Sequence, residues 1–449
     1  MVSRVSRWKA RVQRTGEYEV ILSHSSSIDK CSFEHKYRGV NELPLSALFL
    51  DFDSYFASVE QHLQPHLRGN PIGVAPVEAE TSCCIAASYE AKAFGVKTGT
   101  SIRDARQLCP GITIVPARPE LYVQYHHRLV AAIESCIHVE AVLSIDELWC
   151  WLPYNLRSLE QLAAVGQNIK RAIADQVSPH ITCTIGVAPN RWLAKMASKM
   201  RKPDGFLILE SKDLPDALHP LQLSDLTGVG RSMELRLHSG GIHSVAEICA
   251  VSQQTLHSIW GSIEGDKFWM NLHGMEQVEQ KTTRRSIGHS HVLPPDKRKP
   301  DLALPVVHKL TQKASIRLRK EGYLAGALQL QLRYLHGPGW SAEMRFEHSN
   351  DSLHFAKVVR TLWKKRPDQK APLLQVAMTL NHLLEQNNHT PSLFSQIDPT
   401  RERLNQALDT IRQKHGQKSI HLACEQDGLS AAPMRISFTH IPDVDSENR

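Results

Sequence analysis

The feature that constrains this chain most is a short apolar run that ends in two acids. The stretch LPLSALFLDFD, residues 43–53, has the length and residue types of a buried strand and places Asp51 and Asp53 at its end. Because these acids stand two residues apart, their side chains share one face unless the strand breaks there. The next residues, SYFASVEQHL, predict a helix with Ser54 as its cap.

A second acidic pair follows about 95 residues later. The stretch AVLSIDELWCWL, residues 141–152, predicts a hairpin with Asp146 and Glu147 at its tip. Acids at the ends of neighbouring strands are costly to crowd together unless a cation neutralises them. Mg²⁺ prefers carboxylates, waters and phosphates, so the two pairs together predict a two-metal site for phosphoryl transfer. Any single one of these acids could equally cap a turn on a solvated edge.

Composition excludes several classes of protein. The 449 residues predict about three domains, and 41% hydrophobic with 22% charged residues is typical of a globular protein. No apolar run approaches the roughly 18 residues of a membrane helix, and the basic N-terminus lacks the apolar core of a secretory signal. Nine scattered cysteines without a CxxC pair argue against a disulfide scaffold or structural zinc site and favour a reducing compartment. The net charge of +7 permits a nucleic-acid partner.

The remaining patterns predict an α+β multidomain chain. ITCTIGV (residues 181–187) predicts a strand, and residues 190–205 predict a basic helix that Pro203 and Gly205 stop. Residues 209–276 predict helices only. From residue 289 the order of elements is β-α-β-β-α-β, which describes a small two-layer domain.

Five segments occur in the order and spacing of a known family: LFLDFDSYFASVE, SYEAKAFGVKTG, LSIDEL, TIGVAPNRWLAKMASKMRKPDG and LTGVG. Over residues 44–390 the chain resembles the Y-family, translesion DNA polymerases of the DinB/UmuC type. The resemblance implies a right-hand architecture. Its expected parts are a palm (44–56 and 118–208), small fingers (57–117), a helical thumb with a helix-hairpin-helix (209–276), a linker (277–288), a little finger (289–390) and a C-terminal tail (391–449). Residues 1–43 are expected to be a mobile basic extension, or to precede the true start of the protein.

The resemblance also assigns the metal site. It implies that Asp51, Asp146 and Glu147 are the catalytic carboxylates that bind two Mg²⁺ ions, and that the carbonyl of Phe52 faces a metal. Asp53 belongs to the motif without being one of the three carboxylates, and we expect it to act in a turn or a cap.

The nucleotide site follows from the same resemblance. Phe56 matches the steric gate, the aromatic ring that leaves no space for a ribose hydroxyl, although helical spacing alone would make it a core residue. Tyr89, Lys92 and Lys202 match residues that hold the triphosphate. The family usually has arginine where Lys92 stands, and lysine loses the bidentate fork. Ala86 stands where a hydroxyl residue is common. Lys195 and Lys199 are expected to line a helix face.

Contacts to DNA are expected from three regions. Gly228 and Gly230 resemble a helix-hairpin-helix turn that lets backbone N–H groups approach a phosphate, although such a turn is often only a turn. Further candidates for backbone contacts in the expected little finger and its linker are Arg284, Arg285, Lys309, Lys313, Arg317, Arg319 and Lys320. Leu393 and Phe394 resemble the end of a sliding-clamp peptide, but they could equally fold back on the little finger.

The resemblance implies a template-directed DNA polymerase of low fidelity that extends primer–template DNA with dNTPs during translesion synthesis in the bacterial cytoplasm, at the nucleoid. A catalytically silent adaptor that binds DNA and a sliding clamp is the alternative, although such relatives typically lose palm carboxylates that this chain keeps. A nucleotide cyclase, whose fold can resemble a palm, would have no use for DNA-binding domains.

Overall fold

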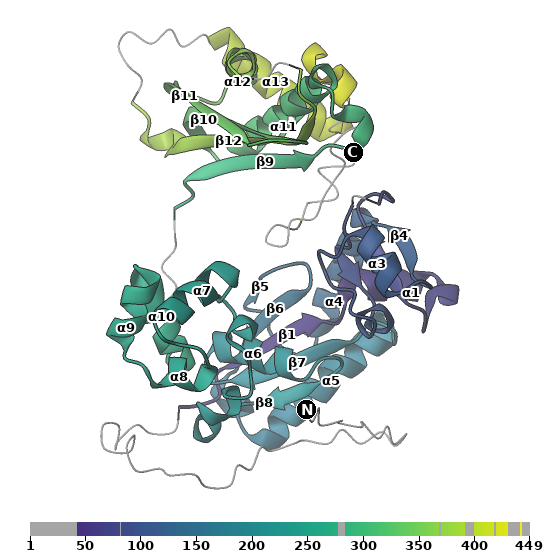
Figure 1. Ribbon diagram of the computed structural model, residues 1–449, viewed down its shortest axis with the longest axis vertical. Helices are drawn as coiled ribbons and strands as arrows, with labels where there is room; N and C mark the ends of the chain where they lie inside the picture. Colours follow the sequence, from purple (N-terminus) through teal and green to yellow (C-terminus); the bar gives the residue numbers. More distant parts are fainter. Residues whose placement is uncertain are drawn as a thin grey trace. The chain divides into compact units, whose positions relative to one another are not determined.

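The computed structural model divides the chain into two compact units, Met1–Val278 and Glu279–Arg449, and each is described by itself (Figure 1). The structure describes residues 43–80, 82–276, 283–367, 370–390, 399–416, 419–429 and 441. The predictions for residues 1–42 and for Leu393 and Phe394 lie outside these ranges. No helix within them is both long and apolar enough to cross a membrane.

The first unit is built on a five-stranded sheet with the order β5–β6–β1–β7–β8. Its strands are β1 (Ala47–Phe52), β5 (Ala141–Val142), β6 (Glu147–Trp151), β7 (Cys183–Ala188) and β8 (Phe206–Ile208). Strand β1 is antiparallel to both neighbours, whereas β8 runs parallel to β7. Three helices accompany this sheet: α4 (Pro119–Glu134), α5 (Leu159–Gln176) and α6 (Arg191–Met200).

Burial of the central strand explains the apolar run in the sequence. All six residues of β1 are buried, because the strand is paired on both edges and α6 packs against it. Gly186 in β7 lets α6 approach the sheet, since an added Cβ there would lie 2.1 Å from the carbonyl oxygen of Ala194. Asn190 starts α6 by accepting a hydrogen bond from the amide of Leu193 (2.8 Å).

Two smaller groups of elements complete the first unit. A three-stranded sheet of order β3–β2–β4 and three helices form the expected fingers and their junction with the palm. These elements are α1 (Tyr55–Leu63), β2 (Ile72–Ala75), β3 (Ala86–Ala87), α2 (Tyr89–Lys92), α3 (Ile102–Leu108) and β4 (Thr113–Pro116). Residues 209–276, all of them described, contain helices and no strand, as predicted. Their α-helices are α7 (Arg231–Ser239), α8 (Val245–Ala250), α9 (Gln253–Trp260) and α10 (Ile263–Leu272).

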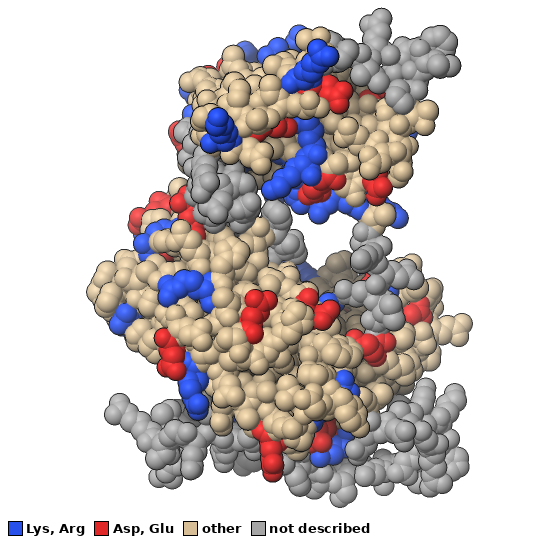
Figure 2. Space-filling view, turned by 180° about the vertical axis from the view of Figure 1, so that it is seen from behind, with Lys and Arg blue, Asp and Glu red and all other residues tan. Residues whose placement is uncertain are grey.

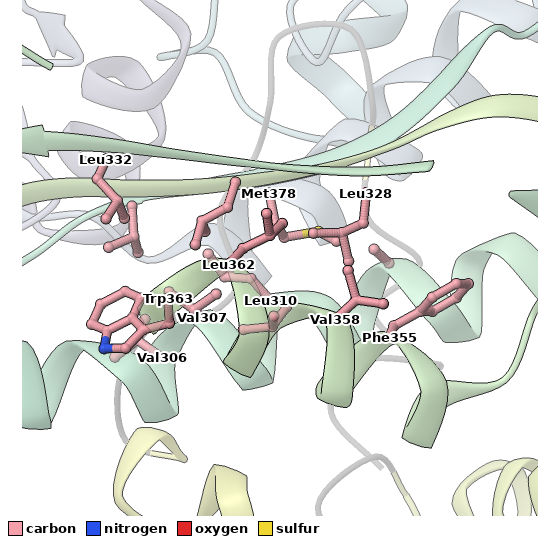
Figure 3. Packing of buried hydrophobic residues seen from close by; sticks show 14 of the residues in the cluster. Val306, Val307, Leu310, Leu328, Leu332, Phe355, Val358, Leu362, Trp363 and Met378 are labelled. Carbon is pink, nitrogen blue, oxygen red and sulfur yellow. The ribbon is translucent and has the colours of Figure 1, made fainter. Parts of the chain in front are cut away.

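The second unit confirms the predicted β-α-β-β-α-β order. Its elements in that order are β9 (Ser286–Val292), α11 (Pro300–Lys320), β10 (Tyr323–Tyr334), β11 (Trp340–Ser349), α12 (Ser352–Lys364) and β12 (Leu373–Glu385). The four strands form an antiparallel sheet of order β11–β10–β12–β9. Figure 3 shows Leu328 and Met378 pointing from the sheet toward Leu310 and Phe355 on the helices. Strand β9 begins within residues 277–288, so the prediction that this whole segment is a linker was wrong at its end.

A C-terminal segment that the sequence patterns left without structure covers the helices of the second unit. Its helix α13 (Pro399–His415) is joined to α11 by Arg319, whose guanidinium donates to both carboxylate oxygens of Asp409 (2.6 and 2.8 Å). Asp351 caps α12 and also accepts from Arg401 and Asn405, each at 3.1 Å. A 3-10 turn at Ala423–Gly428 packs on α11 as well.

Candidate active site

Strand pairing brings the three predicted metal-binding acids to one end of the central sheet. Asp51 on β1 lies directly opposite Glu147, the first residue of β6. The amide of Phe52, the last residue of β1, donates to the carbonyl of Asp146 (2.8 Å). The predicted hairpin is formed by β5 and β6, with Asp146 in its turn. Residues far apart in sequence therefore meet at one sheet end.

Each of the three carboxylates faces a different donor. The ammonium of Lys202 is paired with Asp51, and the ammonium of Lys195 lies 2.6 and 2.7 Å from the two carboxylate oxygens of Glu147. Asp146 accepts from the hydroxyl of Ser144 (2.5 Å). Within the described ranges, the side chains do not form any group of three or more His, Cys, Asp or Glu placed to hold a metal ion. The side chains must turn toward one another before they can share a cation.

The electrostatics of these acids fit divalent-cation ligands. Burial raises the pKa of Asp51 to about 6; the ammonium of Lys202 opposes this shift, and the nearby Asp146 and Glu147 add to it. Burial also raises the pKa of Asp146. Crowded, desolvated carboxylates are destabilised as anions, and a bound cation relieves that cost. Oxygen ligands of this kind are the ones that Mg²⁺ selects. The residues present thus fit the cation that the sequence predicted.

The fingers bring two predicted nucleotide ligands to the same place. Ser88 caps α2 by accepting from the amide of Ala91, and this helix carries Tyr89 and Lys92. The ammonium of Lys92 lies 4.4 Å from the centroid of the Tyr89 ring and donates to the hydroxyl of Ser54 (2.7 Å). Burial lowers the pKa of Lys92, and the positive charge of Lys202 lowers it further. Tyr89, Lys92 and Lys202 therefore lie together beside Asp51.

The predicted steric gate has an aromatic support that the sequence analysis missed. Phe56 in α1 is buried and its ring stacks on Tyr122 of α4, with centroids 4.6 Å apart and planes at 20°. The hydroxyl of Tyr122 donates to Glu60 (2.7 Å), which Arg118 also contacts through two donors. Because Glu60 and Tyr122 are 62 positions apart in the sequence, no local pattern could have revealed this contact.

Of the residues beside the site, Ser54 departs from its expected role. Ser54 occupies the N-cap position of α1 but makes no capping bond with its side chain, because its hydroxyl contacts Lys92. Asp53 lies in a turn, one of the two roles expected of it; its buried carboxylate accepts hydrogen bonds from Thr182 and Thr184, from Tyr89 and from the turn after Lys202. Lys195, expected to line a helix face, reaches Glu147, whereas Lys199 donates to Thr227 (2.9 Å).

The two candidate glycines open a turn ahead of α7. Gly228 has φ 101°, a conformation that favours glycine, and Gly230 is the N-cap of α7 with no atom within 4 Å of an added Cβ. Between them Val229 is buried and anchors the turn. The backbone is thus accessible at Gly230.

The basic candidates of the second unit separate into exposed and engaged residues. Arg284 and Arg285 are exposed ahead of β9, and Arg284 pairs with Glu321 (3.0 Å). Arg319 is bound to Asp409 of α13, and Lys309 donates to the carbonyl of Leu429 (2.7 Å). Arg319 is therefore not a DNA contact in this arrangement. Figure 2 shows Lys and Arg side chains of this unit interspersed with acids on one face.

Comparisons with known proteins agree with this geometry. The model of the impB/mucB/samB family matches residues 50–199, and the model of its C-terminal domain matches residues 284–393. A DNA polymerase IV of Moorella thermoacetica is 31% identical over 395 residues, which cover 85% of this chain and 96% of that protein. The chain belongs to the Y-family of DNA polymerases. A DNA polymerase IV 1 of Bacillus subtilis strain 168 is 29% identical and covers 83% of this Y-family chain and 91% of its own length.

Solved structures support the same fold. A Y-family DNA polymerase chimera of Dbh and Dpo4 matches 76% of this chain and all of its own, with a TM-score of 0.64 and 24% identity. The predicted α+β class and right-hand architecture are confirmed. This Y-family polymerase is a DNA-directed DNA polymerase, an enzyme of translesion synthesis, and enzymes of this kind use divalent metals. The adaptor alternative is not favoured.

Proposed function

We propose that Asp51, Asp146 and Glu147, with the carbonyl of Phe52, hold two Mg²⁺ ions for the transfer of a nucleotide from a dNTP to a primer 3′-hydroxyl. The observation that carries this proposal is the strand register that sets Asp51 across from Glu147, next to Asp146. When bound, such ions lower the pKa of the attacking hydroxyl and neutralise the leaving phosphates. In this structure Lys195 contacts Glu147 and Lys202 contacts Asp51.

We assign the triphosphate to Tyr89, Lys92 and Lys202. Two ammonium groups and a phenol offer donors to phosphate oxygens, and the ammonium groups make charge-assisted hydrogen bonds. Burial, followed by the negative charge of Asp53, raises the pKa of the Tyr89 hydroxyl, so it remains a donor. The ring of Phe56, held flat against Tyr122, is positioned to exclude a ribose hydroxyl.

For DNA, we assign the open turn at Gly228 and Gly230 and the exposed Arg284 and Arg285 to phosphate contacts. Such contacts predict salt-dependent binding that tolerates any sequence, as low-fidelity synthesis past damaged templates requires. The Leu393–Phe394 pair is the candidate for binding a sliding clamp. We place the enzyme in the bacterial cytoplasm, at the nucleoid where its DNA substrate lies.

Primer extension by the full chain with Mg²⁺ and dNTPs tests the catalytic assignment. The double variant Asp146→Ala/Glu147→Ala is expected to bind primer–template DNA as the native chain does and to incorporate nothing. A matched control is Glu160→Ala/Asp175→Ala, which removes two exposed acids of α5 and is expected to retain full extension. Incorporation by the Asp146/Glu147 variant would refute the metal-site assignment, and DNA binding without incorporation by the native chain would favour an adaptor.

A further inference from the structure

Asp53 is a heavily hydrogen-bonded carboxylate beside the site for which the catalytic assignment has no use. The side chain of Asp53 is buried, with the residue 1% exposed, and accepts four hydrogen bonds. Its Oδ1 accepts from the hydroxyls of Thr184 (2.9 Å) and Tyr89 (3.3 Å). Its Oδ2 accepts from the hydroxyl of Thr182 (2.9 Å) and from the amide of Asp204 (2.8 Å). A buried anion that is satisfied in this way is tolerated in a protein interior.

The four donors come from separate parts of the first unit. Thr184 lies in β7 and Thr182 directly precedes it, so both fix Asp53 to the central sheet, whereas Tyr89 belongs to the expected fingers. Asp204 lies two residues after Lys202, in the turn that follows α6. One carboxylate therefore joins the sheet that carries Asp51 to both segments assigned to the triphosphate.

The turn after Lys202 depends on such contacts for its shape. Asp204 has φ 51°, a left-handed conformation that residues other than glycine adopt at a cost. Its amide is held by Asp53, and its carboxylate accepts from the ammonium of Lys170 (2.7 Å). Gly205 is packed so closely that an added Cβ would lie 2.1 Å from the carbonyl oxygen of Arg201. Loss of Asp53 would free the amide of Asp204 and allow the turn to relax.

We propose that Asp53 is a positioning residue for the incoming nucleotide: it fixes the Tyr89 hydroxyl and the Lys202 turn relative to Asp51, so that both meet the triphosphate in one geometry. This inference rests on the assignment of Tyr89 and Lys202 to the triphosphate. Asp53 does not contact the substrate. The hydroxyl of Tyr89 donates its hydrogen bond to Asp53 and is held in place by it while no nucleotide is bound; its O–H turns toward a phosphate oxygen when a nucleotide arrives. The hydrogen bonds from Thr182, Thr184 and Asp204 keep the Asp53 carboxylate compensated during that exchange.

The test is equilibrium binding of a dNTP to the full chain on primer–template DNA, with Ca²⁺ in place of Mg²⁺ so that binding is measured without turnover. Asp53→Ala is expected to weaken dNTP binding about tenfold, the equivalent of losing the positioning effect of one hydrogen bond to a charged group. Its affinity for primer–template DNA is expected to be unchanged. Asp53→Asn keeps the shape and one acceptor oxygen, so it is expected to restore part of the dNTP affinity.

Ser58→Ala is the matched control, because the hydroxyl of Ser58 donates to the backbone carbonyl of Asp53 (2.6 Å) and contacts neither Tyr89 nor the Lys202 turn. It is expected to lower the melting temperature and leave dNTP binding unchanged. Native dNTP affinity in Asp53→Ala, or equal weakening in Asp53→Ala and Ser58→Ala, would overturn the proposal. If Asp53→Ala does not fold, native affinity in Asp53→Asn overturns it, and about threefold weaker binding supports it.

A different result would refute the proposed function. A native chain that binds dNTP with Ca²⁺ and incorporates none with Mg²⁺ would refute the catalytic assignment, while the binding comparison among the Asp53 and Ser58 variants would still decide the positioning role.

Discussion

Ionised Asp51 is expected to destabilise the metal-free protein, so that Asp51→Asn abolishes activity and raises stability. The residue is 6% exposed, and burial outweighs the stabilising ammonium of Lys202 in setting its pKa. Asparagine has the shape of the protonated acid and carries no charge to desolvate. Active sites commonly hold groups whose placement costs stability, and this carboxylate is expected to be one of them.

The magnitude follows from the pKa. A rise from 3.8 to about 6 corresponds to about 3 kcal/mol, at ~1.4 kcal/mol for each pKa unit. Between these two values the folded chain binds more protons than the unfolded chain, so the free energy of unfolding falls as the pH rises through this window. Asp51→Asn should therefore be more stable than the native chain by about 3 kcal/mol at pH 7.5, and by about half as much at pH 5.

Urea unfolding of both chains at pH 7.5 and pH 5, with a chelator present, measures this difference. A saturating divalent cation should stabilise the native chain and reduce the advantage of the variant, because a ligand that binds only the folded state favours it. The reasoning is refuted if Asp51→Asn is less stable than the native chain at pH 7.5, or if its advantage does not shrink at pH 5.

Three further substitutions test separate parts of the structure. Phe56→Ala is expected to raise incorporation of rNTPs relative to dNTPs by at least ~tenfold, because the excluded space opens; an unchanged ratio in single-nucleotide kinetics would refute the gate. Lys92→Arg should lower the KM for dNTP about threefold by restoring a bidentate donor, and a higher KM would contradict this role. Gly186→Ala should cost at least ~2 kcal/mol of unfolding free energy, because the new Cβ meets the carbonyl of Ala194; a native melting temperature would show that α6 can move away.

The sequence predicted those parts of the site that local patterns encode. An apolar run with acids at its end indicates a central strand, and Asp146 and Glu147 within a hairpin pattern indicate a tip. Strand register then brings them together, with Asp51 opposite Glu147. The order of elements in the second unit could also be predicted, because alternating residues such as Leu328 and Leu330 mark the buried face of β10.

Contacts between segments that are distant in the sequence could not be predicted from local patterns. Helix α13 packs on the rest of the second unit through polar side chains, among them Asn405 and Arg412, and both are buried. A pattern search that expects apolar residues on the inner face misses such a helix. Its partners Asp351 and Arg319 are also charged, so neither side of the contact looked like core.

Asp53 shows that membership of a sequence motif does not by itself decide what a residue does. In the sequence it stands beside Asp51 and shares its residue type, yet the two carboxylates have opposite surroundings. Asp51 faces one ammonium and two other acids, so its charge stays costly until a cation arrives. Asp53 is surrounded by four donors, so its charge is already satisfied and gains little from a metal. Most of these partners lie more than a hundred residues away in the sequence, and they are the reason why we propose the metal for Asp51 and the positioning role for Asp53.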